Sequence, residues 1–135
     1  MAYPLRVLLL DPRTAEAALL ANLMREVRPE LECRFVDDPL KVFEAIAREA
    51  TDLIVSELRI RGSDCFDLLR QLKSNAEFKS IPVAIMARQA TAAELEKAKA
   101  LGACFSHIKP ESLADYRKVV FNLMTSWARA IATTP

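Results

Sequence analysis

Five short apolar runs recur along the 135-residue chain, and each is followed by a segment in which apolar residues have helical spacing. The runs have the length of β-strands and cover residues 6–10, 31–36, 53–55, 81–86 and 103–108. Strands that alternate with helices are joined by crossover connections, which parallel strands require. Right-handed crossovers place helices on both faces of the sheet. We therefore predict a single α/β domain over residues 1–135 with a five-stranded parallel sheet and five helices.

Residues that favour helix starts lie between these runs. The five predicted starts are Asp11, Asp38, Asp64, Thr91 and Ser112. An Asp, Thr or Ser side chain can cap the free backbone N–H groups of a first turn, and proline after the cap suits that turn. The last helix is predicted over about residues 112–131. Apolar spacing predicts that Leu19 and Leu40 face the core, and residues 58–64 are expected to form a loop.

Composition excludes several classes of function. Apolar residues make up 52% of the chain and charged residues 27%, with a net charge of +1, which is typical of a globular domain. This balance gives no argument for nucleic acid or an anionic membrane as partner. No run approaches the roughly 20 apolar residues of a membrane span, and the start lacks a signal-peptide pattern, so we expect a cytoplasmic protein. Cys33, Cys65 and Cys104 are expected to be free thiols.

Acidic residues end two of the predicted strands. Chain length and connection count favour the flavodoxin-like strand order 2-1-3-4-5, in which strands one and three are neighbours. Asp11 and Glu57 would then lie at the same carboxyl edge, where ligands bind in such sheets. Lys109 follows strand five and would reach the same edge. The sequence therefore predicts an anion or metal site there.

The chain resembles the receiver domains of two-component response regulators, the CheY-like family. Four motifs fall in the family's order over nearly the whole length: LLLDP, DLIVSEL, PVAIMA and GACFSHIKP. The run FKSIP and the end of the last helix, with Trp127, are most similar to small stand-alone regulators that partner phytochrome-type kinases. The resemblance implies a sensor histidine kinase or another signalling protein as partner.

The resemblance also implies a set of site residues, which this chain keeps only in part. Receivers bind Mg²⁺ through an acidic pair after strand one and through the aspartate that accepts the phosphoryl group. Asp11 matches the first acid of the pair, but Pro12 stands in place of the second. Glu57 occupies the phosphoacceptor position.

The residues that read the phosphoryl group also differ from the family pattern. Ala87 replaces the switch threonine or serine, and Ser106 replaces the aromatic switch residue, whereas Lys109 and Pro110 are retained. In the family the peptide bond before this proline is commonly cis.

These departures predict a degenerate site. Proline supplies no side-chain oxygen, and Mg²⁺ needs well-placed oxygens, so we predict that the metal site is lost and that no cofactor binds. Glu57 displaces its carboxylate by about an ångström relative to aspartate, which disfavours an in-line reaction. We predict no catalytic residues, and a fixed Glu57–Lys109 ion pair that holds the domain in one state.

Simpler interpretations of the same residues remain open. Asp11 can be a helix cap only, Glu57 a solvated acid, and Lys109 a surface lysine. Arg59, Arg61 and Arg88 at this edge are expected to be solvated. The alternative is that they contact an acidic patch on a partner. His107 is expected to be packed in the protein interior.

The last helix carries a wider apolar arc than one buried face needs. We therefore predict a homodimer surface at Phe121, Met124, Trp127 and Ile131. The predicted function is a pseudo-receiver that signals by protein contact without phosphorylation.

Two alternatives stay open. The first is a response regulator that still accepts a phosphoryl group on Glu57 from a sensor histidine kinase. The second is a flavin-binding flavodoxin, which the glycine-free turn at residues 11–14 disfavours.

Overall fold

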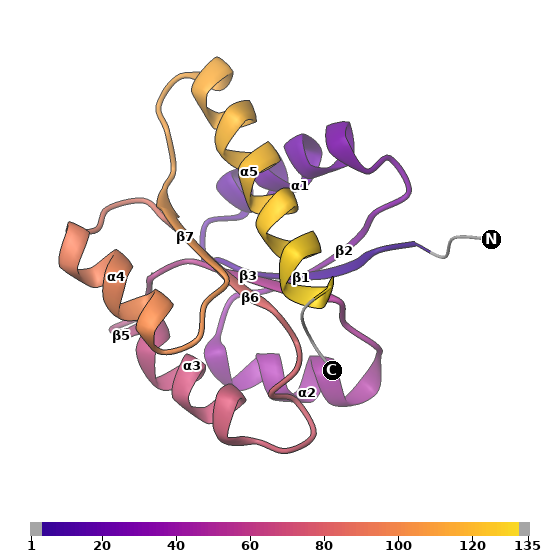
Figure 1. Ribbon diagram of the computed structural model, residues 1–135, viewed down its shortest axis with the longest axis vertical. Helices are drawn as coiled ribbons and strands as arrows, with labels where there is room; N and C mark the ends of the chain where they lie inside the picture. The colour runs from indigo at the N-terminus through magenta and orange to yellow at the C-terminus, as the bar shows by residue number, and fades with distance from the viewer. Residues whose placement is uncertain (1–3, 133–135) are drawn as a thin grey trace.

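A parallel five-stranded sheet forms the centre of the molecule in the computed structural model, which describes residues 4–132 (Figure 1). Its strands are β1 (Arg6–Leu10), β2 (Glu32–Val36), β3 (Leu53–Ser56), β6 (Val83–Ala87) and β7 (Phe105–Ile108). Their order across the sheet is β2-β1-β3-β6-β7, and every pair is parallel. This arrangement confirms the predicted flavodoxin-like fold with β1 and β3 as neighbours.

Five helices cover the two faces of the sheet (Figure 1). They are α1 (Thr14–Val27), α2 (Pro39–Arg48), α3 (Cys65–Ser74), α4 (Ala92–Ala100) and α5 (Leu113–Ala132). Successive side chains of a strand point to opposite faces. Accordingly Val7 and Leu9 of β1 pack with α1 and α5, whereas Leu8 and Leu10 pack with α2 and α3. Within residues 4–132, no helix combines the length and apolar character needed to cross a membrane.

Side-chain caps start four of the helices as predicted. At the start of α5, the Ser112 hydroxyl accepts from the Asp115 N–H at 3.1 Å. Asp38 accepts from the Leu40 N–H at 2.9 Å, and Asp64 accepts from the Phe66 N–H at 3.0 Å. Thr91 and Glu94 form a reciprocal capping box at the start of α4. Each cap satisfies N–H groups that have no partner inside the helix.

The predicted cap at Asp11 is wrong. Helix α1 begins at Thr14, and its capping position is Arg13, which makes no side-chain cap. Asp11 instead accepts from the Arg13 N–H at 2.8 Å, in the turn before the helix. The turn leaves the other carboxylate oxygen of Asp11 free to point toward the edge of the sheet.

Two predicted core positions are exposed. Leu19 is 41% exposed because the buried stripe of α1 passes through Ala17, Leu20 and Met24 beside it. Leu40 is 82% exposed because it lies in the first turn of α2, where Val42 and Ile46 face the core instead.

Residues 58–64 form a short hairpin rather than a loop. Strand β4 (Arg59–Ile60) pairs antiparallel with β5 (Ser63–Asp64). The turn residues Arg61 and Gly62 both have positive φ, at 47° and 81°. Two such residues make a turn whose twist matches paired strands. The hairpin buries Ile60 and leads into α3.

Helix α5 packs on the sheet through two residues that were predicted to form a dimer surface. Met124 and Trp127 are 5% and 8% exposed and belong to the core. The Trp127 indole N–H donates to the Asp52 carbonyl at 2.9 Å. The prediction is therefore wrong for Met124 and Trp127, because α5 turns this side toward the sheet. Phe121 and Ile131 remain 59% and 45% exposed.

Candidate functional site

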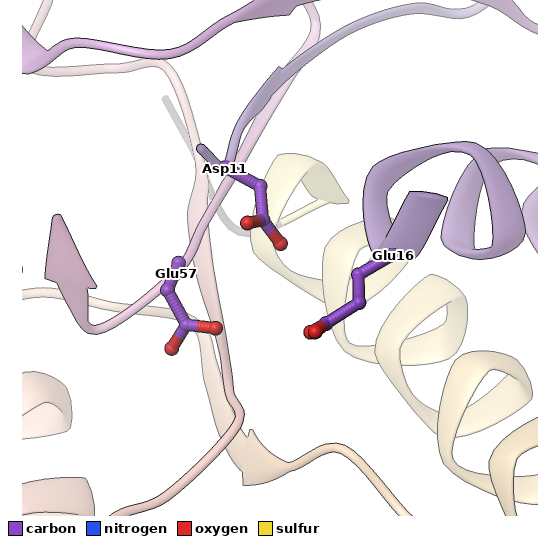
Figure 2. A group of neighbouring side chains, drawn as sticks. All are labelled: Asp11, Glu16 and Glu57. Carbon is purple, nitrogen blue, oxygen red and sulfur yellow. The ribbon is translucent and has the colours of Figure 1, made fainter. Parts of the chain in front are cut away.

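Three carboxylates converge at the carboxyl edge of the sheet, and we call them the acid cluster (Figure 2). Asp11 directly follows β1, Glu57 directly follows β3, and Glu16 comes from the first turn of α1. Each offers an oxygen that lies within 4.8 Å of the other two. Three like charges at this separation need a cation among them.

The ammonium group of Lys109, which follows β7, is that cation. Its Nζ donates to Asp11 Oδ2 at 2.6 Å, to Glu16 Oε1 at 2.8 Å and to Glu57 Oε2 at 2.9 Å. The three hydrogen bonds use all three ammonium donors. The Lys109 side chain is only 7% exposed, so solvent screens these contacts weakly.

The site shifts the pKa values of two of its members. Burial disfavours the Lys109 ammonium, but hydrogen bonds to Asp11, Glu16 and Glu57 outweigh burial and raise the pKa of Lys109 above its ordinary value. Burial likewise opposes the charged form of Glu16, yet the hydrogen bond and charge of Lys109 lower the pKa of Glu16. Both groups are therefore charged at neutral pH.

Glu57 is also bonded to backbone amides on two sides. Its Oε1 accepts from the Leu58 N–H at 2.8 Å and from the Arg88 N–H at 3.0 Å, and its Oε2 lies 3.1 Å from the Arg88 nitrogen. Glu57 is 4% exposed. Because Arg88 directly follows β6, the carboxylate ties the loop between β6 and α4 to the end of β3.

Two arginines complete the charge balance. Arg13 Nη1 lies 3.9 Å from Glu57 Oε2, and Arg88 Nη1 lies 4.0 Å from Glu16 Oε2. Three carboxylates thus face Lys109 and two guanidinium groups, which gives three negative and three positive charges.

The structure therefore brings together three of the residues singled out from the sequence. The predicted Glu57–Lys109 ion pair is confirmed, and Asp11 joins it. The alternatives of a solvated Glu57 and a surface Lys109 are wrong, because both side chains are buried.

Two of the positions where the chain departs from the receiver pattern, Pro12 and Ala87, lie at the same edge, whereas Ser106 lies inside a strand. Pro12 follows Asp11, Ala87 ends β6 and is buried, and Ser106 is buried within β7. Among residues 4–132, the Ser106 hydroxyl has no hydrogen-bond partner. The Lys109–Pro110 bond is trans rather than cis.

Sequence reasoning missed Glu16. An acid in the first turn of a helix is common because it stabilises the positive end of the helix dipole. Its spacing of five residues from Asp11 gave no further indication of a shared site. His107 was also misjudged, since its side chain is exposed and stacks on Phe105 with ring centroids 6.1 Å apart.

The chain is similar to plant response regulators over part of its length, although no family model matches it. It is 34% identical over 73 residues to the two-component response regulator ARR8 of Arabidopsis thaliana, which is 54% of this chain and 32% of that protein. It is 29% identical over 89 residues to ARR3 of the same plant, which is 66% of this chain and 38% of that protein. The chain spans about a third of the length of these relatives.

Solved structures of response regulators share its fold. The phosphorylated cyanobacterial phytochrome response regulator RcpA is 19% identical, with a TM-score of 0.79 over 94% of this chain and 95% of that one. The Mn²⁺-bound response regulator Rcp1 is 20% identical, with a TM-score of 0.77 over 92% and 94%.

The fold and these matches agree with each other. The chain has the fold of CheY-like receiver domains, and part of it is similar in sequence to plant response regulators, as the sequence motifs predicted. At the carboxyl edge of this fold, Lys109 is hydrogen-bonded to all three members of the acid cluster.

Proposed function

We propose that this protein is a pseudo-receiver that signals by protein contact without phosphorylation and without catalysis. The observation that carries the proposal is the ammonium of Lys109 at the centre of the acid cluster, within 2.6–2.9 Å of one oxygen of each acid. In this interpretation residues 1–135 act as one receiver-like domain, and Lys109 supplies the positive charge that a divalent cation would supply.

Three features argue that Mg²⁺ does not fit the acid cluster in this conformation. Mg²⁺ requires oxygens at about 2.0–2.1 Å in near-octahedral geometry. The Lys109 Nζ already holds one oxygen from each acid, and Pro12 adds no side-chain ligand. A divalent ion would also place two further positive charges in a cluster whose charges already balance. We therefore propose that the metal site is lost.

The bonding of Glu57 argues against phosphoryl transfer. Both of its oxygens already accept hydrogen bonds, from Lys109 and from two backbone amides. An in-line attack needs a correctly placed oxygen and neutralisation of the developing charge. Ala87 offers no hydroxyl to read a phosphoryl group.

Glu57 has a structural role in this proposal. Its bonds to the Arg88 amide and to Lys109 connect the ends of β3, β6 and β7. In the receiver family that this chain resembles, the loop that corresponds to β6–α4 changes position when the protein signals. A permanent carboxylate at this place would hold the loop in one state.

The second candidate is a receiver that accepts a phosphoryl group on Glu57 from a sensor histidine kinase. It is favoured by the three carboxylates within 4.8 Å of one another, which could ligate a metal if Lys109 moved away. RcpA, which shares the fold, is described as phosphorylated, and Rcp1 as Mn²⁺-bound.

Intact-mass spectrometry separates the two candidates. We would incubate the protein with Mg²⁺ and acetyl phosphate, and in parallel with Mg²⁺ and beryllofluoride while recording amide NMR spectra. We expect no added mass and no Mg²⁺-dependent shifts. The single variant Glu57→Asp should behave likewise, because Pro12 and Ala87 are unchanged. A phosphorylated wild-type protein would refute the proposal.

We propose that the partner is a sensor histidine kinase of the phytochrome type or another signalling protein in the cytoplasm. The shared fold with RcpA, named as a phytochrome response regulator, supports that choice. Co-purification with a sensor histidine kinase from the same organism tests it, and failure to retain any such kinase would count against it. We also propose a homodimer through the exposed side of α5, at Phe121 and Ile131.

A further inference from the structure

A pocket lies between α1 and the start of α5, two helices that pack on the same face of the sheet (Figure 1), and we call it the α1–α5 pocket. Its volume is about 290 Å³. Small-molecule sites in proteins range from about 300 to 1,000 Å³ and are mostly apolar, with a few polar groups that fix the ligand. The α1–α5 pocket is therefore large enough for a small organic molecule.

Part of the pocket wall is apolar. It consists of Leu19 from α1, Pro110 from the segment before α5, and Leu113 and Tyr116 from α5. Leu19 and Leu113 are 41% and 46% exposed, so both leucines keep apolar surface in contact with water. Covering such surface is favourable in proportion to its area. The pocket therefore favours an occupant with an apolar body.

The charged lining residues leave no charge for a ligand to neutralise. Glu16, Arg88 and Lys109 line the pocket and belong to the acid cluster and its counter-charges, whose three negative and three positive charges balance. Lys109 already uses all three ammonium donors within the cluster. Glu111, the remaining charged residue of the lining, is exposed to solvent. A charged ligand would lose hydration here without gaining a partner, so the pocket favours an uncharged one.

Tyr116 supplies a polar group that has no partner in the fold. The residue is 5% exposed, and within residues 4–132 its hydroxyl makes no hydrogen bond. A buried tyrosine hydroxyl usually has a partner, because an unsatisfied polar group does not recover the cost of leaving water. Burial raises the pKa of Tyr116 to about 12, so the hydroxyl keeps its proton at neutral pH and can donate it. The charges of Lys109 and Glu16 act on this hydroxyl, which places it near the end of the pocket that these two residues line.

We propose that the α1–α5 pocket binds an uncharged organic molecule with an apolar body and one oxygen atom that accepts a hydrogen bond from Tyr116. The apolar body would cover Leu19 and Leu113, and the oxygen would pair with the buried hydroxyl. Binding leaves the hydrogen bonds of Lys109 in place, so the inference does not depend on whether Glu57 accepts a phosphoryl group. It goes beyond the proposed function because it gives the domain a small-molecule ligand.

Amide NMR titrations with two matched probes test the inference. The probes are 4-ethylphenol and ethylbenzene, which share the apolar body and differ in the hydroxyl group. We expect saturable shifts at Leu19 and Leu113, with 4-ethylphenol binding about fivefold more tightly because it makes one more hydrogen bond. In Tyr116→Phe the two probes should bind equally. Because Tyr116→Phe removes an unsatisfied hydroxyl, thermal unfolding should show a variant at least as stable as the wild type.

A second pair of variants locates the bound probe. Leu113→Ala removes part of the apolar wall and should weaken the binding of 4-ethylphenol by about fivefold. Leu40→Ala is the matched control and should leave binding unchanged, since Leu40 is an exposed leucine on α2 outside the pocket.

Several results would overturn the inference. If neither probe gives saturable shifts, the pocket takes no such ligand, and a side chain of a partner protein is the alternative occupant. Equal binding of the two probes to the wild type, a preference for 4-ethylphenol that persists in Tyr116→Phe, or equal weakening by Leu113→Ala and Leu40→Ala would also contradict it. Tighter binding of 4-ethylbenzoate than of 4-ethylphenol would show that the ligand is an acid instead. The mass measurement with acetyl phosphate judges the proposed function separately.

Discussion

Lys109 stabilises a group of charges that would otherwise repel one another. Removing one member of a buried ion pair leaves its partners without compensation, which costs about 3–5 kcal/mol. We therefore expect Lys109→Met to lower the free energy of unfolding by about this amount at pH 7. Urea denaturation measures it, with exposed Lys118→Met as the control. A loss no larger than that of the control would show that the cluster does not stabilise the fold.

The same residues set the pH range of stability. The pKa of Glu16 is lowered from 4.5, so its contribution is present above pH 4.5 and is lost as the pH falls through the folded-state value. The pKa of Lys109 is raised from 10.5, so its contribution is present below pH 10.5 and is lost as the pH rises through the folded-state value.

Each of two variants should therefore reduce the pH dependence of the free energy of unfolding, one at acidic pH and the other at alkaline pH. In urea denaturation between pH 3 and pH 11, Glu16→Gln should flatten the decrease below pH 4.5, and Lys109→Met should flatten the decrease above pH 10.5. Because Glu16 is partly screened by solvent, the change at acidic pH should be smaller than the change at alkaline pH. If stability decreased equally at alkaline pH in the wild type and in Lys109→Met, a group other than Lys109 would be responsible for the decrease.

At the scale of the elements, the capping box of α4 is open to a direct test. Thr91 accepts from the Glu94 N–H at 3.1 Å, and Glu94 accepts from the Thr91 N–H at 2.9 Å. Thr91→Ala should lower the free energy of unfolding by about 1 kcal/mol, because it removes one of these bonds. Thr14→Ala, at the uncapped start of α1, is the control and should have a smaller effect. Equal effects in chemical denaturation would contradict the assignment.

The elements also show where prediction from sequence succeeds. Runs such as Val7 to Leu10 carry enough apolar residues to be recognised as buried strands, and Asp38 and Thr91 sit directly before helical patterns. The β4–β5 hairpin was not recognised, because strands of two residues are too short to show a period. Leu19 was assigned to the core because a shift of one position along a helix turns a residue by about 100°.

At the scale of the molecule, Trp127 joins α5 to the start of β3. Its indole N–H donates to the Asp52 carbonyl, and its ring lies 5.7 Å from the Arg28 guanidinium. Trp127→Phe should lower the free energy of unfolding by about 1–3 kcal/mol, because the carbonyl loses its donor. Leu113→Ala, at an exposed position of the same helix, should change it by less than about 0.5 kcal/mol. Thermal or urea unfolding compares the two variants, and a larger loss for Leu113→Ala would contradict this placement.

The proposed homodimer is tested by light scattering over a dilution series. We expect a dimer at micromolar concentration for the wild type and a monomer for Phe121→Glu, because a charge at an apolar contact opposes association. Leu40→Glu is the control, since Leu40 is exposed on α2, which packs against the opposite face of the sheet. A monomeric wild type would refute the dimer.

The amino-acid sequence by itself determined the α/β class, the strand order and the meeting of Asp11, Glu57 and Lys109, because apolar periodicity and the topology of parallel sheets bring these strand ends to one edge. Only the tertiary structure decided that Glu16 joins them and that Met124 and Trp127 face the core. The bonds of Lys109 link residues 98, 93 and 52 positions apart in the chain. Such contacts depend on how each helix is rotated against the sheet and how far each side chain reaches, which local patterns do not specify.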